Sequence, residues 1–220
     1  MQRVKEKAIQ LLKDGVVDRV IGWKAGEFFY DLTPAVFTSA EEVEKDFVWS
    51  VFSAANVSKY LIAESKKGGR IAAFLKPCDS YSFVQLCKEH RIAKENVYVV
   101  GVQCDGTCDI EKLKALGFKG VTGVEERGEE LLVSTLYGGK TAAKKDALLE
   151  RCTVCKSKRI AYFDELLGEQ GEDCGDARFE TVEKLEAMTP EERFAFWRGE
   201  LSRCIRCNAC RNVCPACSCE

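Results

Sequence analysis

Apolar residues recur every three or four positions near the start of the chain and form short runs further on. The first pattern predicts a helix over residues 4–14, which ends at Gly15, a residue common just past helix ends. Two short strands are predicted at residues 16–23 and 26–32. Residues 39–42, Ser-Ala-Glu-Glu, have the form of a capping box and predict the start of a second helix.

The centre of the chain contains two continuous apolar runs, residues 70–75 and 97–102. A helical stretch over residues 81–90 separates them, which is typical of a parallel strand, helix, strand unit whose strands are buried on both faces. Further elements are predicted around this unit: helices at 56–66, 109–118 and 142–149, and a hairpin formed by 119–126 and 130–137.

Together these elements predict an α/β domain over residues 1–165, with a mostly parallel sheet flanked by helices. Residues 166–188 are rich in glycine and acidic side chains and predict a linker. Residues 189–192, Thr-Pro-Glu-Glu, combine an N-cap, a proline at the first helical position and a glutamate three residues past the cap. Residues 189–220 are therefore expected to form a helix and a small α-helical, ferredoxin-like module.

Composition narrows the classes of function. The 220 residues carry 33 basic and 35 acidic side chains, for a net charge of −2, so neither a nucleic-acid partner nor a membrane span is expected. Thirteen cysteines stand against one histidine, so any metal site must be a thiolate site. The odd cysteine number, the clustered spacing and the missing signal-like apolar region predict a reducing cytoplasm.

The strongest motif lies near the end of the chain, where Cys204, Cys207, Cys210, Cys214 and Pro215 follow the pattern C-x2-C-x2-C-x3-C-P. This is the ferredoxin spacing for a 4Fe-4S cluster. Zinc sites instead pair their cysteines in two separated C-x2-C knuckles. The spacing therefore favours a cluster over zinc.

The spacing does not determine which residue is the fourth ligand of this cluster. In two-cluster ferredoxins, the fourth cysteine of such a run ligates the other cluster, whose remaining ligands come from a second run. The sequence has no second run, so the fourth ligand is Cys214, Cys217 or Cys219, or a missing tail supplies it. The end of the sequence shortly after the run favours a truncated module.

Four further cysteines are candidates for a second site, although they lie far apart in the sequence: Cys78, Cys104, Cys152 and Cys155. Cys78 and Cys104 each follow a predicted strand and precede a helix, so they belong to the same carboxyl edge of the sheet, where α/β proteins bind ligands. The helix N-termini there favour an anionic group. Cys152 and Cys155 are positioned to complete a four-thiolate site from a loop.

Other interpretations of these cysteines remain open. A four-cysteine zinc site has the same ligand types, and Cys152 with Cys155 also has the spacing of a redox dithiol. Cys87 lies within a predicted helix and is expected to be a small buried apolar residue. Cys108 and Cys174 are unassigned.

The order of the segments resembles the beta-subunit family of the hydrogenases and dehydrogenases that use the deazaflavin coenzyme F(420). The resemblance covers residues 15–168 and rests on motifs such as KPCDSYSF, VQCDGTCD and RCTVCKSKR. It implies an α/β iron-sulfur flavoprotein with FAD near the cluster. The cluster ligands that it implies are Cys78, Cys104, Cys152 and Cys155. A Gly-Ser-Lys-Tyr element of the family falls on residues 57–60, with Val57 in place of glycine, and implies cofactor-binding roles for Ser58, Lys59 and Tyr60.

The chain also departs from the family pattern, because its ferredoxin run follows the α/β domain rather than preceding it. This order is similar to that of iron-sulfur subunits associated with formate dehydrogenase and heterodisulfide-reductase-like assemblies. The sequence contains no G-x-G-x-x-G after a strand and so gives no independent signal for a dinucleotide, which leaves FAD as an expectation from kinship alone. A deazaflavin or nicotinamide coenzyme is a candidate partner.

These observations predict an electron-transfer subunit of an anaerobic oxidoreductase complex, with two 4Fe-4S clusters and FAD, rather than a complete enzyme. The redox partners expected are other subunits of a hydrogenase, formate dehydrogenase or heterodisulfide-reductase-like complex. The alternative is a partner-docking module with a four-cysteine zinc site and one C-terminal cluster.

Overall fold

The main sheet of the computed structural model, which describes residues 2–172 and 177–217, has the strand order β2-β1-β4-β5-β9. Neighbouring strands are parallel from β1 to β9, whereas β2 pairs with β1 in the antiparallel sense and the short β3 also pairs with β1. The strands are β1 Arg19–Ala25, β2 Leu32–Phe37, β3 Phe47–Val48, β4 Ile71–Leu75, β5 Val97–Val102 and β9 Glu165–Leu167.

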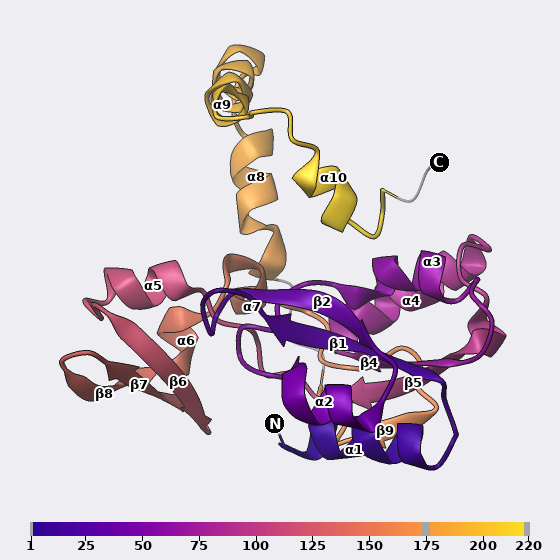
Figure 1. Ribbon diagram of the computed structural model, residues 1–220. Helices are drawn as coiled ribbons and strands as arrows, with labels where there is room; N and C mark the ends of the chain where they lie inside the picture. The colour runs from indigo at the N-terminus through magenta and orange to yellow at the C-terminus, as the bar shows by residue number, and fades with distance from the viewer. Residues whose placement is uncertain (1, 173–176, 218–220) are drawn as a thin grey trace.

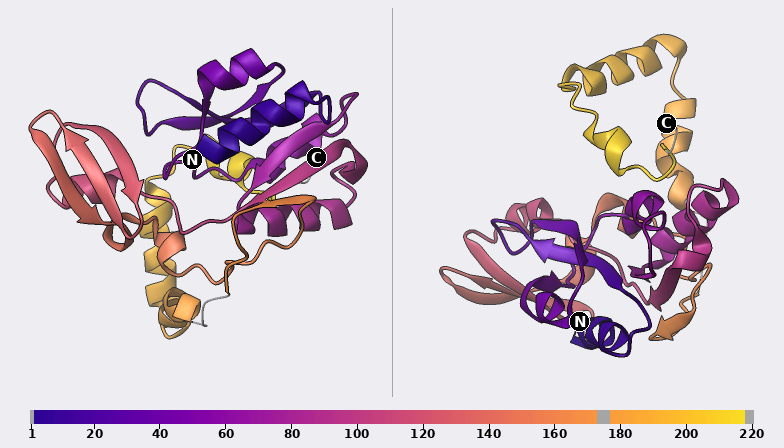
Figure 2. Two further views of the ribbon diagram at one scale, coloured as in Figure 1. Left: turned by 90° about the horizontal axis from the view of Figure 1, so that it is seen from below. Right: turned by 45° about the vertical axis from the view of Figure 1, so that its right-hand side comes forward.

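Helices cover both faces of this sheet (Figures 1 and 2). One face packs on α1 Gln2–Lys13 and α2 Ala40–Asp46, and its buried core includes Phe74. The other face packs on η1 Val57–Tyr60, α3 Leu61–Glu64 and α4 Pro77–Lys88, and its core includes Trp23. The predicted α/β class, a mostly parallel sheet flanked by helices, is confirmed.

The central strands explain why their sequences read as continuous apolar runs. Every residue of β4 is buried, and its side chains alternate between the two helical layers, with Ala72 and Phe74 on one side and Ile71 and Ala73 on the other. A strand covered on both faces has no solvent side, so polar alternation is lost.

A second, antiparallel sheet lies beside the first and has the order β6-β7-β8 (Figure 2). Leu131 and Val133 of its central strand pack on Leu113 and Cys108, so Cys108 is a core residue. The elements of this region are α5 Ile110–Ala115, β6 Val121–Arg127, β7 Glu130–Thr135, β8 Gly138–Ala143, α6 Lys144–Ala147 and α7 Glu150–Thr153. The short helix η2 Lys94–Asn96 directly precedes β5 of the main sheet.

Several element boundaries differ from the sequence prediction, among them the following three. Residues 26–31 form a turn rather than a strand, because Gly26 N donates to Asp31 O (2.6 Å) and the chain reverses before β2 begins at Leu32. The predicted helix at 142–149 begins within β8, and only residues 144–147 are helical there. The helix predicted at 81–90 begins earlier, at Pro77, because proline suits the first helical position.

The last part of the chain leaves the α/β domain as helices η3 Ala177–Phe179, α8 Glu180–Glu186, α9 Pro190–Ser202 and α10 Ala209–Val213. Figure 1 shows α8 and α9 projecting away from the main sheet and α10 returning toward it. The predicted capping box of α9 is present, since Glu192 N donates to Thr189 Oγ1 (3.3 Å) and Thr189 N donates to Glu192 Oε2 (2.9 Å). Within the described residues, no helix has the length and apolar character that crossing a membrane requires.

Candidate functional site

The structure brings four predicted cysteines to one small cavity of about 30 Å³ at the carboxyl edge of the main sheet. Cys78 lies in the first turn of α4, directly after β4, and Cys104 follows β5. Cys152 is in α7, and Cys155 lies two residues past its end. The topology of a parallel sheet therefore gathers side chains that the sequence separates by up to 77 positions.

Two of the sulfur atoms have hydrogen-bond partners in the wall of this cavity. The amide and hydroxyl of Thr107 lie 3.5 Å and 3.3 Å from Cys152 Sγ, and the Cys155 thiol donates to Ser157 O (3.4 Å). Gly106, beside Thr107, has φ = 103°, and a Cβ atom there would lie 2.6 Å from Leu148 Cδ2. Only glycine therefore fits this close turn without strain.

The protein atoms around the cavity raise the pKa of two of its cysteine thiols, Cys78 and Cys104. Although Cys78 keeps an exposed face, the surrounding protein atoms remove enough water to raise the pKa of its thiol to about 12, and the Asp79 carboxylate adds to this effect. Burial also raises the pKa of Cys104, while the Gly106 backbone and Lys76 act in the opposite direction. Without a metal these two thiols stay protonated at neutral pH, so metal binding would release their protons.

The donor set fits a 4Fe-4S cluster, since four cysteines from separate segments meet at one cavity. The cations Lys76, Arg151 and Lys158 share its lining and suit an anionic group. A single zinc ion needs all four sulfurs about 2.3 Å from one point. Across residues 2–172 and 177–217, no three histidine, cysteine or carboxylate side chains lie close enough together to hold one metal ion. The arrangement of a single-zinc site is therefore not present among these residues.

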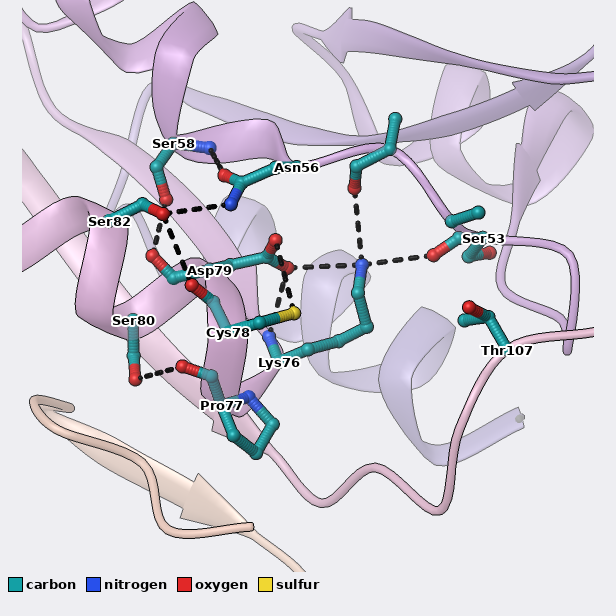
Figure 3. A network of polar contacts seen from close by, with 12 residues as sticks. Ser53, Asn56, Ser58, Lys76, Pro77, Cys78, Asp79, Ser80, Ser82 and Thr107 are labelled. Carbon is teal, nitrogen blue, oxygen red and sulfur yellow. Dashed lines mark hydrogen bonds and ion pairs between the residues drawn. The ribbon is translucent and has the colours of Figure 1, made fainter. Parts of the chain in front are cut away.

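A buried ion pair lies directly behind Cys78 (Figure 3). The Lys76 ammonium is 3.0 Å from Asp79 Oδ2, and the two side chains are 4% and 0% exposed. Lys76 Nζ also donates to Ser53 O (2.9 Å) and Ala55 O (3.2 Å) and lies 4.4 Å from the centroid of the Trp23 ring. Lys76 is thus a fixed positive charge at the wall of the cysteine cavity.

The segment predicted to bind a cofactor lies next to this pair, in the 3-10 helix η1. Ser58 is fully buried, and its hydroxyl donates to Asp79 O (2.6 Å), so it supports the first turn of α4. Lys59 and Tyr60 line a much larger cavity of about 650 Å³. This cavity lies between β2, α3 and the C-terminal segment, and its lining includes Pro34, Ala35, Val36, Ile62, Ala63, Arg211, Asn212 and Cys217.

The C-terminal cysteines are more open. Cys204, Cys207 and Cys210 are exposed, and Cys214 is half-buried. Arg206 and Asn208 both have φ = 59°, the left-handed conformation, and Arg206 N donates to Cys204 Sγ (3.4 Å). Successive backbone amides turned by such residues form concavities that bind anions and iron-sulfur groups.

Cys214 and Cys217 lie in contact at the end of α10. The Ala216 amide, followed by the Cys217 thiol, lowers the pKa of Cys214, while the same contact raises the pKa of Cys217. Cys217 therefore lies beside the fourth cysteine of the run. Cys174 and Cys219 lie outside the described residues.

The sequence did not predict the contact between Lys59 and the C-terminal segment. Lys59 Nζ donates to the backbone carbonyls of Arg211 (2.9 Å), Cys214 (3.0 Å) and Cys217 (2.6 Å). These residues lie 152 to 158 positions further along the chain. No local pattern signals a contact over that separation.

The fold and its sites define a cysteine-rich α/β protein with two candidate metal-binding regions. No family model matches the chain. It is 26% identical to the F420-dependent formate dehydrogenase 1 subunit beta of Methanococcus maripaludis, over 96% of this chain and 70% of that protein. It is also 26% identical to the F420-dependent formate dehydrogenase subunit beta of Methanocaldococcus jannaschii, over 95% of this chain and 70% of that protein.

A solved structure has a related fold. A chain in the F420-reducing [NiFe] hydrogenase complex from Methanosarcina barkeri matches with a TM-score of 0.55 and 17% identity, over 70% of this chain and 59% of that one. The curated relatives confirm the resemblance to the beta-subunit family of F(420)-using dehydrogenases and hydrogenases. The match to the first relative extends over 272 positions, more than the 220 residues of this chain, so that relative contains segments missing here.

Proposed function

We propose that the chain is an electron-transfer subunit of an anaerobic oxidoreductase complex. The observation that carries the proposal is the cavity in which Cys78, Cys104, Cys152 and Cys155 meet. These residues would hold one 4Fe-4S cluster. A second cluster would be held by Cys204, Cys207 and Cys210, with Cys214 or Cys217 as the fourth ligand. Such clusters accept and donate single electrons.

The surrounding residues suit this role. Thr107 would orient Cys152 through its amide and hydroxyl, and hydrogen bonds to sulfur raise the reduction potential of a bound cluster. Lys76 would offset negative charge from a buried position, where solvent screens it little.

The large cavity is our candidate for FAD. Its volume of about 650 Å³ lies within the usual range for ligand sites. The Tyr60 ring and the apolar side chains of β2 would contact a flat ring system, and Arg211 at the margin suits a phosphate. Ser58 would act indirectly, by holding η1 against α4.

The partners that we propose are other subunits of a formate dehydrogenase, hydrogenase or heterodisulfide-reductase-like complex, with a deazaflavin or nicotinamide coenzyme as the eventual electron partner. The names of the two curated relatives support the formate dehydrogenase case and the deazaflavin. A cytoplasmic location belongs to the same proposal, since reducing compartments preserve thiolate ligands.

The test is the iron, acid-labile sulfide, zinc and flavin content of protein purified without oxygen. The proposal predicts about eight iron and eight sulfide per chain, because each cubane contributes four of each. Cys104→Ser should lose about four iron, whereas Cys87→Ser should retain all of them, because Cys87 lies outside the cavity. One zinc per chain that disappears in Cys104→Ser would establish the zinc site and overturn the first cluster.

A further inference from the structure

Lys59 uses its whole ammonium group to hold the C-terminal segment. The three carbonyls that it contacts belong to Arg211, Cys214 and Cys217, at the end of α10 and in the turn that follows. An ammonium group has three N–H donors, so these contacts occupy all of them. The backbone carbonyls at the end of a helix carry partial negative charge, which favours a cation there.

The same segment forms one wall of the large cavity. Arg211, Asn212 and Cys217 line it from the C-terminal side, while Lys59 and Tyr60 line it from the α/β domain. The cavity is therefore a composite of two parts of the chain that lie far apart in sequence. Its shape depends on where the C-terminal turn rests.

The rest of the C-terminal region offers little apolar packing. In α9 and beyond, Phe194, Trp197, Leu201 and Ile205 are exposed. The position of residues 211–217 therefore depends on polar contacts rather than on burial. A charged donor with three acceptors is the kind of contact that can fix such a segment.

We propose that Lys59 is a positioning residue that clamps the C-terminal cysteine turn, residues 211–217, onto η1 and thereby closes one wall of the 650 Å³ cavity. The clamp places Cys217, which lies beside the fourth cysteine of the C-terminal run, at the margin of the cavity. It also puts a positive charge close to Cys214, since Lys59 Nζ donates to Cys214 O (3.0 Å). The inference rests on the proposed function only where it concerns the cluster potential.

The experiment compares Lys59→Met, which removes the charge and the donors, with Lys59→Arg, which keeps both. Lys66→Met is the matched control, because Lys66 is an exposed lysine just past α3 that does not line the cavity. Hydrogen exchange of the amides in residues 209–217 is measured on the full chain, prepared without oxygen. The midpoint potential of the C-terminal cluster is then measured by a redox titration followed by electron paramagnetic resonance.

Lys59→Met should speed exchange in residues 209–217 by about tenfold or more, because the hydrogen bonds that hold the turn are lost. Its cluster potential should become more negative, because a nearby positive charge stabilises the reduced form. Lys59→Arg should restore slow exchange and most of the potential, and Lys66→Met should match the wild type in both measurements.

Equal exchange and equal potential in Lys59→Met and Lys66→Met would overturn the clamp. Loss of C-terminal iron in Lys59→Met but not in Lys66→Met would support it. If the wild-type chain holds no iron in the C-terminal run, the proposed second cluster is wrong, while the exchange comparison still decides whether Lys59 clamps the turn.

Discussion

Replacing Lys76 by methionine should strongly destabilise the chain. Methionine keeps the length and apolar stem of lysine but removes the ammonium group, which contacts Asp79 Oδ2 at 3.0 Å and two backbone carbonyls. The Asp79 side chain has no exposed surface. The substitution therefore leaves a carboxylate buried without its counter-charge.

The expected cost follows from this burial. Removing one partner of a buried ion pair typically costs about 3–5 kcal/mol, because the remaining charge has neither water nor a counter-charge. The orphaned carbonyls of Ser53 and Ala55 add to the cost, whereas an exposed pair such as Lys24 and Asp46 would contribute about 0–1 kcal/mol. We expect Lys76→Met to fall within the buried range.

Native-state hydrogen exchange of the β4 and β5 amides measures this loss, since the slowest amides report the free energy of global unfolding. The double variant Lys76→Met with Asp79→Asn provides the sharper test. A neutral amide has no charge to compensate, so adding Asp79→Asn to Lys76→Met should restore stability by about 2 kcal/mol. Lys24→Met is the matched control, with little expected change.

Two results would refute this reasoning. If Lys76→Met costs less than about 1 kcal/mol, the pair behaves like a surface pair and its burial has no energetic consequence. If the double variant is less stable than Lys76→Met alone, the Asp79 charge is not the source of the instability.

Three further substitutions test the packing and the turns. Gly22→Ala should cost about 1–3 kcal/mol by urea denaturation, because its Cβ would lie 2.1 Å from Phe47 Cε2, and an unchanged midpoint would contradict the close packing. Thr189→Ala should cost about 1 kcal/mol of local stability, seen as faster amide exchange in α9 alone, and unchanged α9 exchange would show that the cap contributes nothing. Gly106→Ala should reduce the iron bound at the cavity of Cys78, Cys104, Cys152 and Cys155, because φ = 103° is strained for alanine. Elemental analysis measures this loss, and full iron occupancy would show that the turn can adjust.

The sequence predicted the central strands well because their burial is visible as continuous apolar runs. β4 and β5 are covered on both faces, so each reads as an unbroken apolar run. The error at residues 26–32 has the opposite origin. Their aromatic residues suggested a strand, but Phe29 packs edge-on against Phe52 at 5.7 Å between ring centroids while the backbone turns. Strand β8, Gly-Gly-Lys-Thr-Ala-Ala, was missed because it lacks alternating β-branched or aromatic residues.

The candidate site was predictable in part. The positions of Cys78 and Cys104 follow from the rule that parallel strands end at a common edge, because each cysteine comes just after its strand. The approach of Cys152 depends on α7 and on its contact with Thr107, which no local pattern indicates. The contact of Lys59 with Cys214 is a hydrogen bond from a side chain to a distant backbone carbonyl, so it leaves no apolar periodicity to detect.

The 3-10 helix η1 connects the three regions of the candidate site because its geometry separates neighbouring side chains. A 3-10 helix has about three residues per turn, so successive side chains point about 120° apart. Ser58 accordingly contacts Asp79 behind the first cysteine group, Lys59 contacts the turn of the second, and Tyr60 faces the large cavity. Asn56 fixes this orientation by accepting from Ser58 N (3.0 Å). The local geometry of η1 thus links a contact 21 positions along the chain, to Asp79, with contacts more than 150 positions along it, to Arg211 and Cys214.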